Sequence, residues 1–213
     1  MRILDAFDRI RIINLPQRVD RRREMDRELA KIGLIDDPRV AYFPAIRPDG
    51  AGAFTSIGAH GVYLSQKTIL REAAAAGESL LILEDDCAFI AGAGESADPG
   101  GWDIYYGGYA ASMPDNLPES DIEGAHMMGF TAAGARRVSD YLEKLTCEGI
   151  HPPIDGAYVW FRRANPDVRT GFAVPPLAEQ RSSRSDIADL KWYDRTPLVR
   201  GLVGGLRSLR VRS

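Results

Sequence analysis

The segment from Leu80 to Asp86 constrains the fold more than any other part of this chain. Four apolar residues are followed directly by three carboxylates, those of Glu84, Asp85 and Asp86. A continuous apolar run of this length, bounded by turn residues, is typical of a strand buried on both faces of a parallel sheet. Ligands of open α/β sheets bind just beyond the ends of such strands. The segment therefore predicts a buried strand with a ligand site at its end.

The three adjacent carboxylates repel one another, so the arrangement costs free energy unless a positive group binds there. Hard divalent cations such as Mg²⁺ and Mn²⁺ prefer oxygen ligands. The simplest interpretation of the three carboxylates is therefore that they bind a metal that holds a substrate phosphate. Alternate side chains of a strand share a face, which brings Glu84 and Asp86 together. The alternative is a solvated acidic turn after a core strand.

Composition indicates one globular domain. The 213 residues are 45% hydrophobic, which is enough for a sizeable core. A formal charge of -3 gives no overall attraction to nucleic acid, and no stripe of basic and aromatic residues is present, so nucleic acid is not expected as a partner. Cys87 and Cys147 are too few and too far apart for a zinc site, and they indicate a reducing compartment.

Strand and helix patterns alternate along the chain. Strands are expected at residues 10–15, 80–83, 102–106, 126–131 and 171–174. Helices are expected at residues 21–32, 62–76 and 132–144, the first of them capped by Asp20 and ended by Gly33. A Pro/Gly-rich loop is expected at 44–52, and residues 157–161 fit a strand or a helix. This alternation of strands and helices predicts an α/β fold with a mainly parallel central sheet, in a single domain over residues 1–190.

The two ends of the chain bear on localisation. Residues 1–5 lack an apolar stretch with a cleavage site, and no apolar run approaches the roughly 18 residues of a membrane span, which predicts a cytoplasmic protein. Residues 191–213 form a basic amphipathic tail of the kind that can lie on an anionic membrane surface. Peripheral contact with the inner face of the cytoplasmic membrane is therefore one expectation. Three glycines weaken a helix there, so docking onto the domain or disorder are the alternatives.

A series of short motifs follows a fixed order along residues 10–187. They are Asn14-Leu15 with Arg18 and Arg21, Gly61 to Ser65, Leu83 to Asp86, Trp102 to Gly107, Gly129 to Ala135, Ile154-Asp155 and Ser185 to Ile187. In this order they resemble glycosyltransferase family 25, which contains bacterial lipooligosaccharide galactosyltransferases. Each motif is weak alone, but the shared order is fairly specific.

The resemblance implies a GT-A fold, a Rossmann-like fold that binds nucleotide diphospho-sugars. It also implies a hexosyltransferase that uses a UDP-sugar, with galactose as the first expectation, and Mn²⁺ or Mg²⁺ as cofactor. The acceptor would be lipopolysaccharide, lipooligosaccharide or another surface or lipid-linked glycan, and transfer would invert the configuration. The chain has Ala59, Val62 and Gln66 where the family usually has Glu, Cys and His. A relative that binds a nucleotide sugar or glycan without transfer is therefore the alternative.

Donor-side roles follow from the chemistry of a leaving diphosphate, whose charge a metal and an arginine can neutralise. By analogy with Asp-x-Asp motifs, Asp86 is assigned to the metal, with Glu84 or Asp85 binding the ribose or a metal-bound water; Glu84 is also a candidate metal ligand. Guanidinium groups suit diphosphate oxygens, which makes Arg18 and Arg21 candidates, although a solvated helix start is the alternative.

Three further donor-side residues are predicted. Asn14 is expected to hold the nucleotide base or to cap the end of its strand. From the resemblance alone, Gln180 and Ser185 are expected to close over the diphosphate.

Acceptor-side roles follow from the proton that the attacking hydroxyl must lose. Asp155 is the candidate base, since two prolines stiffen the segment before it and Gly156 lets a ligand approach closely. Its alternative role is a helix cap, and the three histidines are held in reserve. Tyr106 and Tyr109 are expected to stack on an acceptor sugar, with core packing as the alternative for Tyr106.

Overall fold

The computed structural model describes residues 1–181. The predicted tail at 191–213, the expected domain boundary at 190 and the candidate donor residue Ser185 all lie outside the described residues. Residues Met1–Arg181 form one compact unit. Within this described part, no helix is long and apolar enough to cross a membrane.

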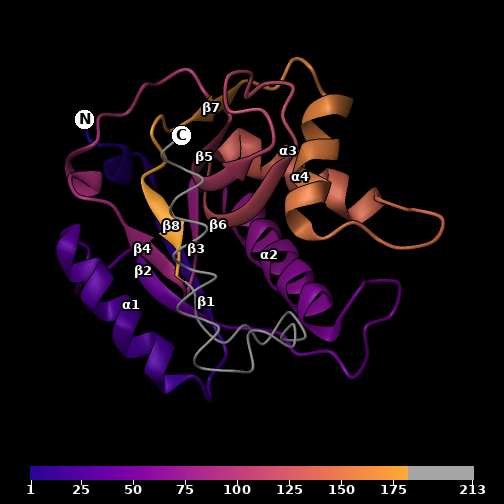
Figure 1. The fold of residues 1–213 in the computed structure, drawn as a ribbon, viewed down its shortest axis with the longest axis horizontal. Helices are drawn as coiled ribbons and strands as arrows, with labels where there is room; N and C mark the ends of the chain where they lie inside the picture. Colours follow the sequence, from indigo (N-terminus) through magenta and orange to yellow (C-terminus); the bar gives the residue numbers. More distant parts are fainter. Residues whose placement is uncertain (182–213) are drawn as a thin grey trace, which may run out of the picture. The chain divides into compact units, whose positions relative to one another are not determined.

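A six-stranded sheet forms the centre of the described unit (Figure 1). Its strands, in spatial order, are β2 (Val40–Pro44), β1 (Arg9–Asn14), β3 (Leu80–Glu84), β6 (Ile122–Phe130), β5 (Ile104–Ala111) and β7 (Thr170–Phe172). Strand β6 runs antiparallel to both of its neighbours, whereas every other pair is parallel. The predicted α/β fold with a mainly parallel central sheet is confirmed.

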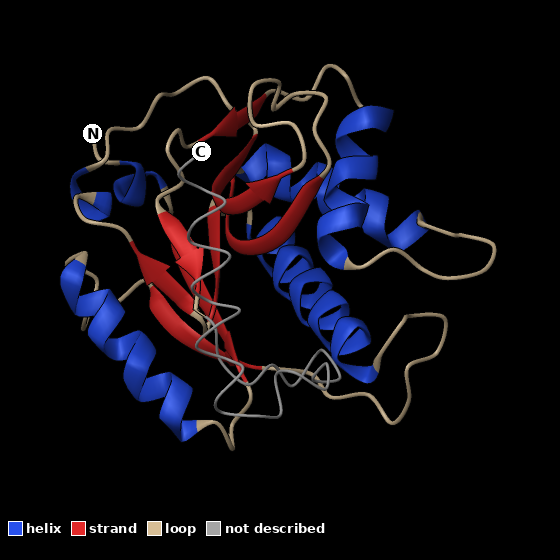
Figure 2. Cartoon of the chain, in the orientation of Figure 1, coloured by secondary structure: helices blue, strands red, loops and turns tan. Residues whose placement is uncertain are grey.

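Helices cover both faces of this sheet (Figure 2). Helix α1 (Val19–Lys31) lies on one side, and α2 (Ile57–Ala76), α3 (Ala132–Lys144) and α4 (Ile154–Ala164) lie on the other. Short 3-10 helices form at Ile3–Ala6 and Ala93–Glu95. A second, two-stranded antiparallel sheet pairs β4 (Cys87–Phe89) with β8 (Ala178–Gln180).

Strand β3 is buried on both faces, as its apolar run predicts. Leu80 and Ile82 belong to the core beneath α2, α3 and α4, whereas Leu81 and Leu83 belong to the core beneath α1. All four side chains are 0% exposed. Since burying one such side chain contributes about 1.5–3 kcal/mol, this strand anchors the residues that follow it.

Two helices begin earlier than predicted, since α1 begins at Val19 rather than at Arg21 and α2 begins at Ile57 rather than at Val62. Helix α1 begins at Val19 after Arg18, so the prediction of Asp20 as its N-cap is wrong; Asp20 lies in the first turn, where a carboxylate is favoured by the helix dipole. Residues 157–161, which fitted either state, are helical and belong to α4. Strand β2 was not predicted, since the pattern of alternation in Val40–Pro44 is weak.

Candidate functional site

The carboxyl ends of β1 and β3 meet at one edge of the sheet. The two strands are parallel and adjacent, with Ile13 opposite Glu84, so Asn14 lies next to the turn that holds Asp85 and Asp86. The first turn of α1 supplies Arg21 to the same place. The strand order therefore brings together four residues that sequence analysis placed at the donor site.

Asp85 is held by two of these neighbours. Asn14 Nδ2 donates to Asp85 Oδ2 at 2.7 Å, and Arg21 Nη1 donates to Asp85 Oδ1 at 2.8 Å. All three residues are buried, with exposed fractions of 6–7%. Charge-assisted hydrogen bonds in such a setting are short and directional. Both carboxylate oxygens of Asp85 thus accept hydrogen bonds, and these bonds hold the middle residue of the acidic triplet in one orientation.

Asp86 is held on one side only. Its Oδ2 accepts from Gln180 Nε2 at 3.2 Å and lies 3.6 Å from Arg21 Nη1. Its Oδ1 is buried and has no hydrogen-bond donor among residues 1–181. Burial raises the pKa of Asp86, and Arg21 and Gln180 oppose that shift. Gln180, which was predicted to close over a diphosphate, thus lies beside the acidic triplet, and one carboxylate oxygen of Asp86 remains available.

Arg181 closes this side of the site and was not foreseen from the sequence. Its Nη2 donates to the main-chain oxygen of Asp85 at 2.6 Å, and its main-chain nitrogen donates to that of Asp86 at 2.8 Å. Its guanidinium also lies 3.5 Å from Glu24 of α1. Only the pairing of β8 with β4 brings it here, so no local pattern could have indicated it.

Glu84 is the least compensated carboxylate of the site. No hydrogen bond to it is found in the described part of the chain. Desolvation, followed by the negative charges of Asp86, Asp155 and Asp85, raises the pKa of Glu84 from 4.5 to about 8. Four carboxylates from β3, its following turn and α4 therefore share one electrostatic environment.

These residue types fit a divalent cation. Among residues 1–181, no group of three or more His, Cys, Asp and Glu side chains forms a complete metal site. Mg²⁺ commonly binds through one or two carboxylates together with waters and substrate phosphates rather than in an all-protein cage. Glu84 and the free Oδ1 of Asp86 could supply such a partial shell.

The raised pKa of Glu84 predicts a pH-dependent stability. The folded protein keeps a proton that the unfolded chain loses between pH 4.5 and about 8, so stability falls as the pH rises through that window. A change of one in pKa corresponds to about 1.4 kcal/mol. We therefore expect Glu84→Gln to be a few kcal/mol more stable than the parent above pH 8 and similar to it near pH 5, measured by urea unfolding. Parallel curves of stability against pH for Glu84→Gln and the parent would contradict the assignment.

Asp155 joins α4 to β6. It lies in the first turn of α4, after the N-cap Pro153. Its Oδ2 accepts from the main-chain nitrogen of Gly124 at 2.9 Å, and its Oδ1 accepts from that of Gly156 at 2.8 Å. The alternative role of Asp155 as a helix cap is therefore wrong, because Pro153 is the N-cap and Asp155 lies in the first turn. Asp155 also contributes to the field at Glu84.

Gln66, one of the departures from the family pattern, lies behind these carboxylates. It is 0% exposed, and its Oε1 accepts from the Tyr158 hydroxyl of α4 at 2.7 Å. Burial raises the pKa of Tyr158, and the charges of Glu84 and Asp155 add to that shift. Gln66 thus ties α2 to α4 one helical turn after Asp155.

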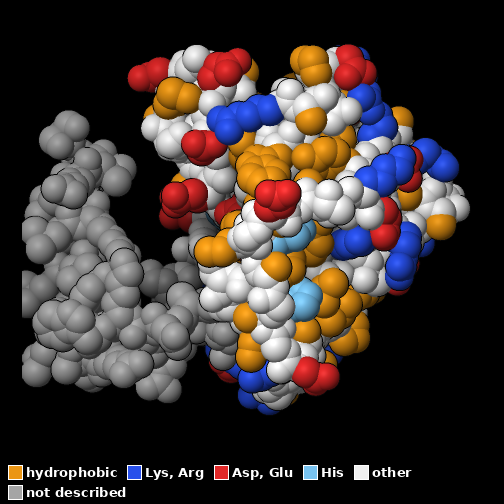
Figure 3. Space-filling model, turned by 90° about the vertical axis from the view of Figure 1, so that its right-hand side faces the viewer, with side chains coloured by type: hydrophobic (Ala, Val, Ile, Leu, Met, Phe, Trp, Pro, Cys, Tyr) orange, Lys and Arg blue, Asp and Glu red, His pale blue; other side chains and the backbone are white. Residues whose placement is uncertain are grey.

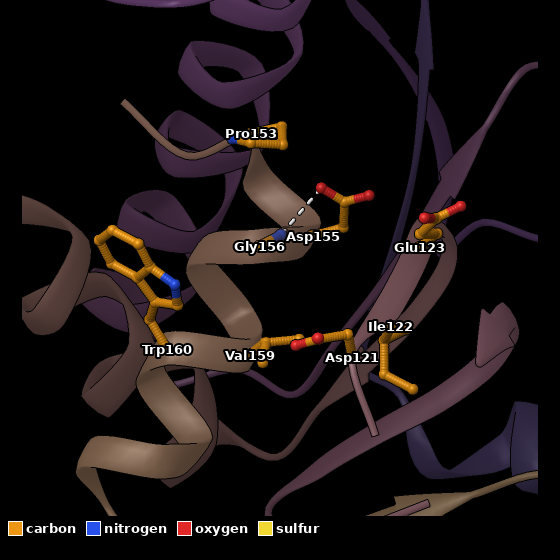
Figure 4. A pocket seen from close by; sticks show the side chains of 8 residues that line it. All are labelled: Asp121, Ile122, Glu123, Pro153, Asp155, Gly156, Val159 and Trp160. Carbon is orange, nitrogen blue, oxygen red and sulfur yellow. Dashed lines mark hydrogen bonds between the residues drawn. The ribbon is translucent and has the colours of Figure 1, made fainter. Parts of the chain in front are cut away.

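A pocket of about 200 Å³ opens beside Asp155 (Figure 4). It lies between the start of β6 and the first two turns of α4. Its lining residues are Asp121, Ile122, Glu123, Pro153, Asp155, Gly156, Val159 and Trp160. Of these residues, Asp155 was predicted from the sequence, whereas Glu123 and Trp160 were not. Trp160 is 43% exposed, yet a tryptophan within an ambiguous apolar segment carries no pattern that distinguishes surface from core.

The contacts found for three predicted residues, Arg18, Tyr106 and Tyr109, are with other parts of the protein. The guanidinium of Arg18 donates to Asp20 through Nη2 at 2.8 Å, at the solvent-exposed start of α1. Tyr106 is 0% exposed and stacks on Phe172, so its ring offers no surface to a sugar and core packing accounts for it. Tyr109 is also buried, and its hydroxyl donates to the Ala173 carbonyl at 2.8 Å.

The three histidines lie away from the pocket lining. His126 is 4% exposed, its Nε2 lies 3.0 Å from the Ala178 carbonyl, and burial lowers its pKa. His60 and His151 both pack against Phe54. On the face shown in Figure 3, histidine side chains accordingly lie among hydrophobic ones.

Arg162 fixes the loop that leads into the pocket. It is 8% exposed, and its guanidinium donates to the carbonyls of Ser120 at 2.9 Å and Pro118 at 3.1 Å. We expect Arg162→Met to lower the free energy of unfolding by about 3 kcal/mol, because it leaves the buried carbonyl of Ser120 without this donor and removes the part-buried bond to Pro118. The neighbouring Arg163 is half exposed and pairs with Asp121, so Arg163→Met should cost less than about 1 kcal/mol. Equal losses in urea unfolding would show that the Arg162 bonds are energetically neutral.

Comparisons with known proteins give structural matches only. No protein-family model matches the chain, and no curated protein matches it by sequence. The chain is similar to a glycosyltransferase involved in the glycosylation of the major capsid of PBCV-1, at 12% identity and a TM-score of 0.49, over 82% of this chain and 95% of that one. It is similar to apo GlyE, a glycosyltransferase of Streptococcus pneumoniae TIGR4, at 10% identity and a TM-score of 0.45, over 96% of this chain and 64% of that one.

A further solved structure, A197 from STIV, is similar at 11% identity and a TM-score of 0.38, over 86% of this chain and 98% of that one. The chain spans less than two thirds of the length of GlyE. Similarity at these identities and TM-scores assigns no function, and the resemblance to family 25 stays a prediction from the motifs.

Proposed function

We propose that the chain is a metal-assisted glycosyltransferase whose nucleotide-sugar donor binds at the carboxyl end of β3. The observation that carries the proposal is the cluster of Glu84, Asp85, Asp86 and Asp155, in which Glu84 has a pKa of about 8 and Asp86 has a buried oxygen without a donor in the described part of the chain. This cluster calls for positive charge. A divalent cation supplies that charge, and it can bind the diphosphate of the substrate at the same time.

The donor side is assigned as follows. Glu84 and Asp86 would hold Mn²⁺ or Mg²⁺, which neutralises the leaving diphosphate when bound. Arg21, fixed against Asp85 at 2.8 Å, adds a permanent positive charge beside it. Asn14 and Asp85 orient the donor from the strand ends, with Arg18, Gln180 and Ser185 as further donor contacts.

The acceptor side centres on Asp155. The acceptor hydroxyl attacks the anomeric carbon as the bond from that carbon to the diphosphate oxygen breaks, and Asp155 takes the hydroxyl proton. Both Asp155 oxygens accept main-chain hydrogen bonds, which hold the carboxylate in one orientation. Attack opposite the leaving group inverts the anomeric configuration.

The finer assignment follows the motif resemblance. It comprises a GT-A fold of the family 25 kind, a UDP-hexose donor with galactose as the first expectation, and a lipopolysaccharide, lipooligosaccharide or other surface-glycan acceptor on the cytoplasmic side. Contact between the basic tail and a membrane would bring a lipid-linked acceptor within reach.

The test is a thermal-shift screen of nucleotide sugars with and without Mn²⁺, because a ligand that binds only the native state raises its apparent stability. A shift that needs both the metal and one UDP-sugar supports the donor site and identifies the sugar. No shift with any nucleotide sugar contradicts it. A shift without transfer to any glycan would identify a binding protein, which is the alternative suggested by Gln66, a residue engaged with Tyr158.

A further inference from the structure

The pocket beside Asp155 has the size of a site for one sugar ring. Its volume of about 200 Å³ is below the roughly 300–1,000 Å³ of pockets that enclose drug-sized ligands. In Figure 4, Trp160 lies at one side and Glu123 at the other, with Gly156 between them. Gly156 has no side chain, so it leaves open the space beside Pro153, another residue of the lining.

Trp160 provides an apolar platform at the edge of this pocket. It is 43% exposed, which leaves part of a large aromatic face in water. Aromatic rings combine a broad apolar face with a polar edge, and the C–H face of a pyranose matches such a surface. Val159 and Ile122, both buried, complete the apolar part of the lining.

The polar part of the lining is entirely acidic. Its ionisable side chains are Asp121, Glu123 and Asp155, and no Lys, Arg or His lines the pocket. Arg163 pairs with Asp121 at 3.0 Å, and both oxygens of Asp155 accept main-chain hydrogen bonds. The side chain of Glu123 is exposed and makes no ion pair or hydrogen bond in the described part of the chain. Such a lining accepts hydrogen bonds from hydroxyl or ammonium groups and repels anions.

We infer that this pocket binds the acceptor sugar, and that it selects a neutral or amine-bearing ring over one that carries phosphate or carboxylate. The inference rests on the proposed function, since the bound sugar is an acceptor only if the chain is a transferase. Asp155 connects the two sides, because it lines the pocket and its charge also acts on Glu84 at the donor side. Trp160 stacks on the ring, and Glu123 sets the charge preference.

The first experiment measures transfer from UDP-galactose with Mn²⁺ to methyl glycosides of galactose, glucosamine and glucuronic acid, and to a methyl galactoside phosphate. We expect the neutral and amino sugars to be used at least about tenfold better than the two anionic ones. Trp160→Ala should raise the acceptor KM by about tenfold with donor affinity unchanged. Ile35→Ala, which removes an equally exposed apolar side chain outside the pocket, should change neither.

Two substitutions separate pocket occupancy from folding. Glu123→Lys should narrow or reverse the preference against anionic sugars, because it replaces the unpaired charge of the lining. Gly156→Ala should weaken acceptor binding while preserving the fold, since the added Cβ would lie 3.4 Å from the Pro152 Cβ, an ordinary contact. Equal use of anionic and neutral sugars by the parent, or an unchanged acceptor KM in Trp160→Ala, would overturn the inference and leave the transferase assignment intact.

A second measurement keeps the inference testable if no transfer occurs from UDP-galactose. Saturation-transfer NMR of the same glycosides detects binding to the full chain directly. Binding of the neutral and amino sugars that is lost in Trp160→Ala supports the sugar pocket even if the transferase assignment fails. Absence of binding by every glycoside, in a protein that transfers no sugar, overturns both.

Discussion

Replacing Asp86 with asparagine is expected to abolish Mn²⁺-dependent binding of the nucleotide sugar while the fold stays intact. The substitution keeps the side-chain volume and removes the charge from the one carboxylate that has a buried oxygen without a donor in residues 1–181. It also removes a negative neighbour of Glu84, so stability should not fall. We expect a loss of metal-dependent donor affinity of about 100-fold or more, which titration calorimetry measures directly.

The matched control for Asp86→Asn is Glu179→Gln. Glu179 is an exposed carboxylate on β8, the strand that supplies Gln180 to the site, and its neutralisation should leave donor binding unchanged. Unaltered Mn²⁺-dependent binding in a folded Asp86→Asn protein would exclude Asp86 as a metal ligand. Equal loss in both variants would indicate a general effect of negative charge rather than coordination.

Replacing Asp155 with asparagine is expected to reduce the rate of transfer by about 10²–10⁴, the usual contribution of a general base. Donor binding should be retained, since the metal-binding assignment involves Glu84 and Asp86 at the end of β3. The measurement is kcat for transfer alongside the donor affinity in the same preparation. A general base is indicated if kcat falls while donor affinity is unchanged, and if the fall in kcat is not explained by a loss of stability.

Asp155 also accepts from Gly124 and Gly156, so the structural effect needs its own control. The thermal midpoint of Asp155→Asn reports the lost tie between β6 and α4. Asp121→Asn removes a carboxylate of the same pocket that pairs with Arg163 and should lower kcat only slightly. A folded Asp155→Asn protein with nearly full kcat would remove Asp155 from the proposed mechanism.

Much of the fold follows from local patterns. The apolar run at Leu80–Leu83 predicted a strand buried on both faces, and the structure distributes its residues between two cores. The helix expected at 62–76 is α2. It begins after Ser56, whose hydroxyl accepts from Ala59 nitrogen at 3.0 Å, and it ends at Gly77, which has a φ of 70°. Caps, glycines and periodicity act over a few residues, so they can be recognised without the tertiary structure.

The strand order and the closing contacts could not be predicted in this way. Antiparallel β6 lies between β3 and β5, although nothing in its composition separates it from a parallel strand. Tyr106 ends a predicted strand and Tyr109 follows it after two glycines, a setting that suits either a sugar platform or the core. Packing against Phe172 and Ala173 decided for the core. Arg181 reached Asp85 and Asp86 only through the pairing of β8 with β4.

The sequence by itself determined that a buried strand would end in three carboxylates, that Asn14 would lie near the end of another strand, and that Arg21 would begin the helix after it. The charge of a residue and the period of a segment are local properties, so they specify what chemistry the chain carries. The tertiary structure alone decided how that charge is shared: Asp85 is compensated by Asn14 and Arg21, whereas Glu84 and one oxygen of Asp86 are not. Compensation depends on which groups from distant segments come within about 3 Å of each other, and only the packed strands and helices set those distances.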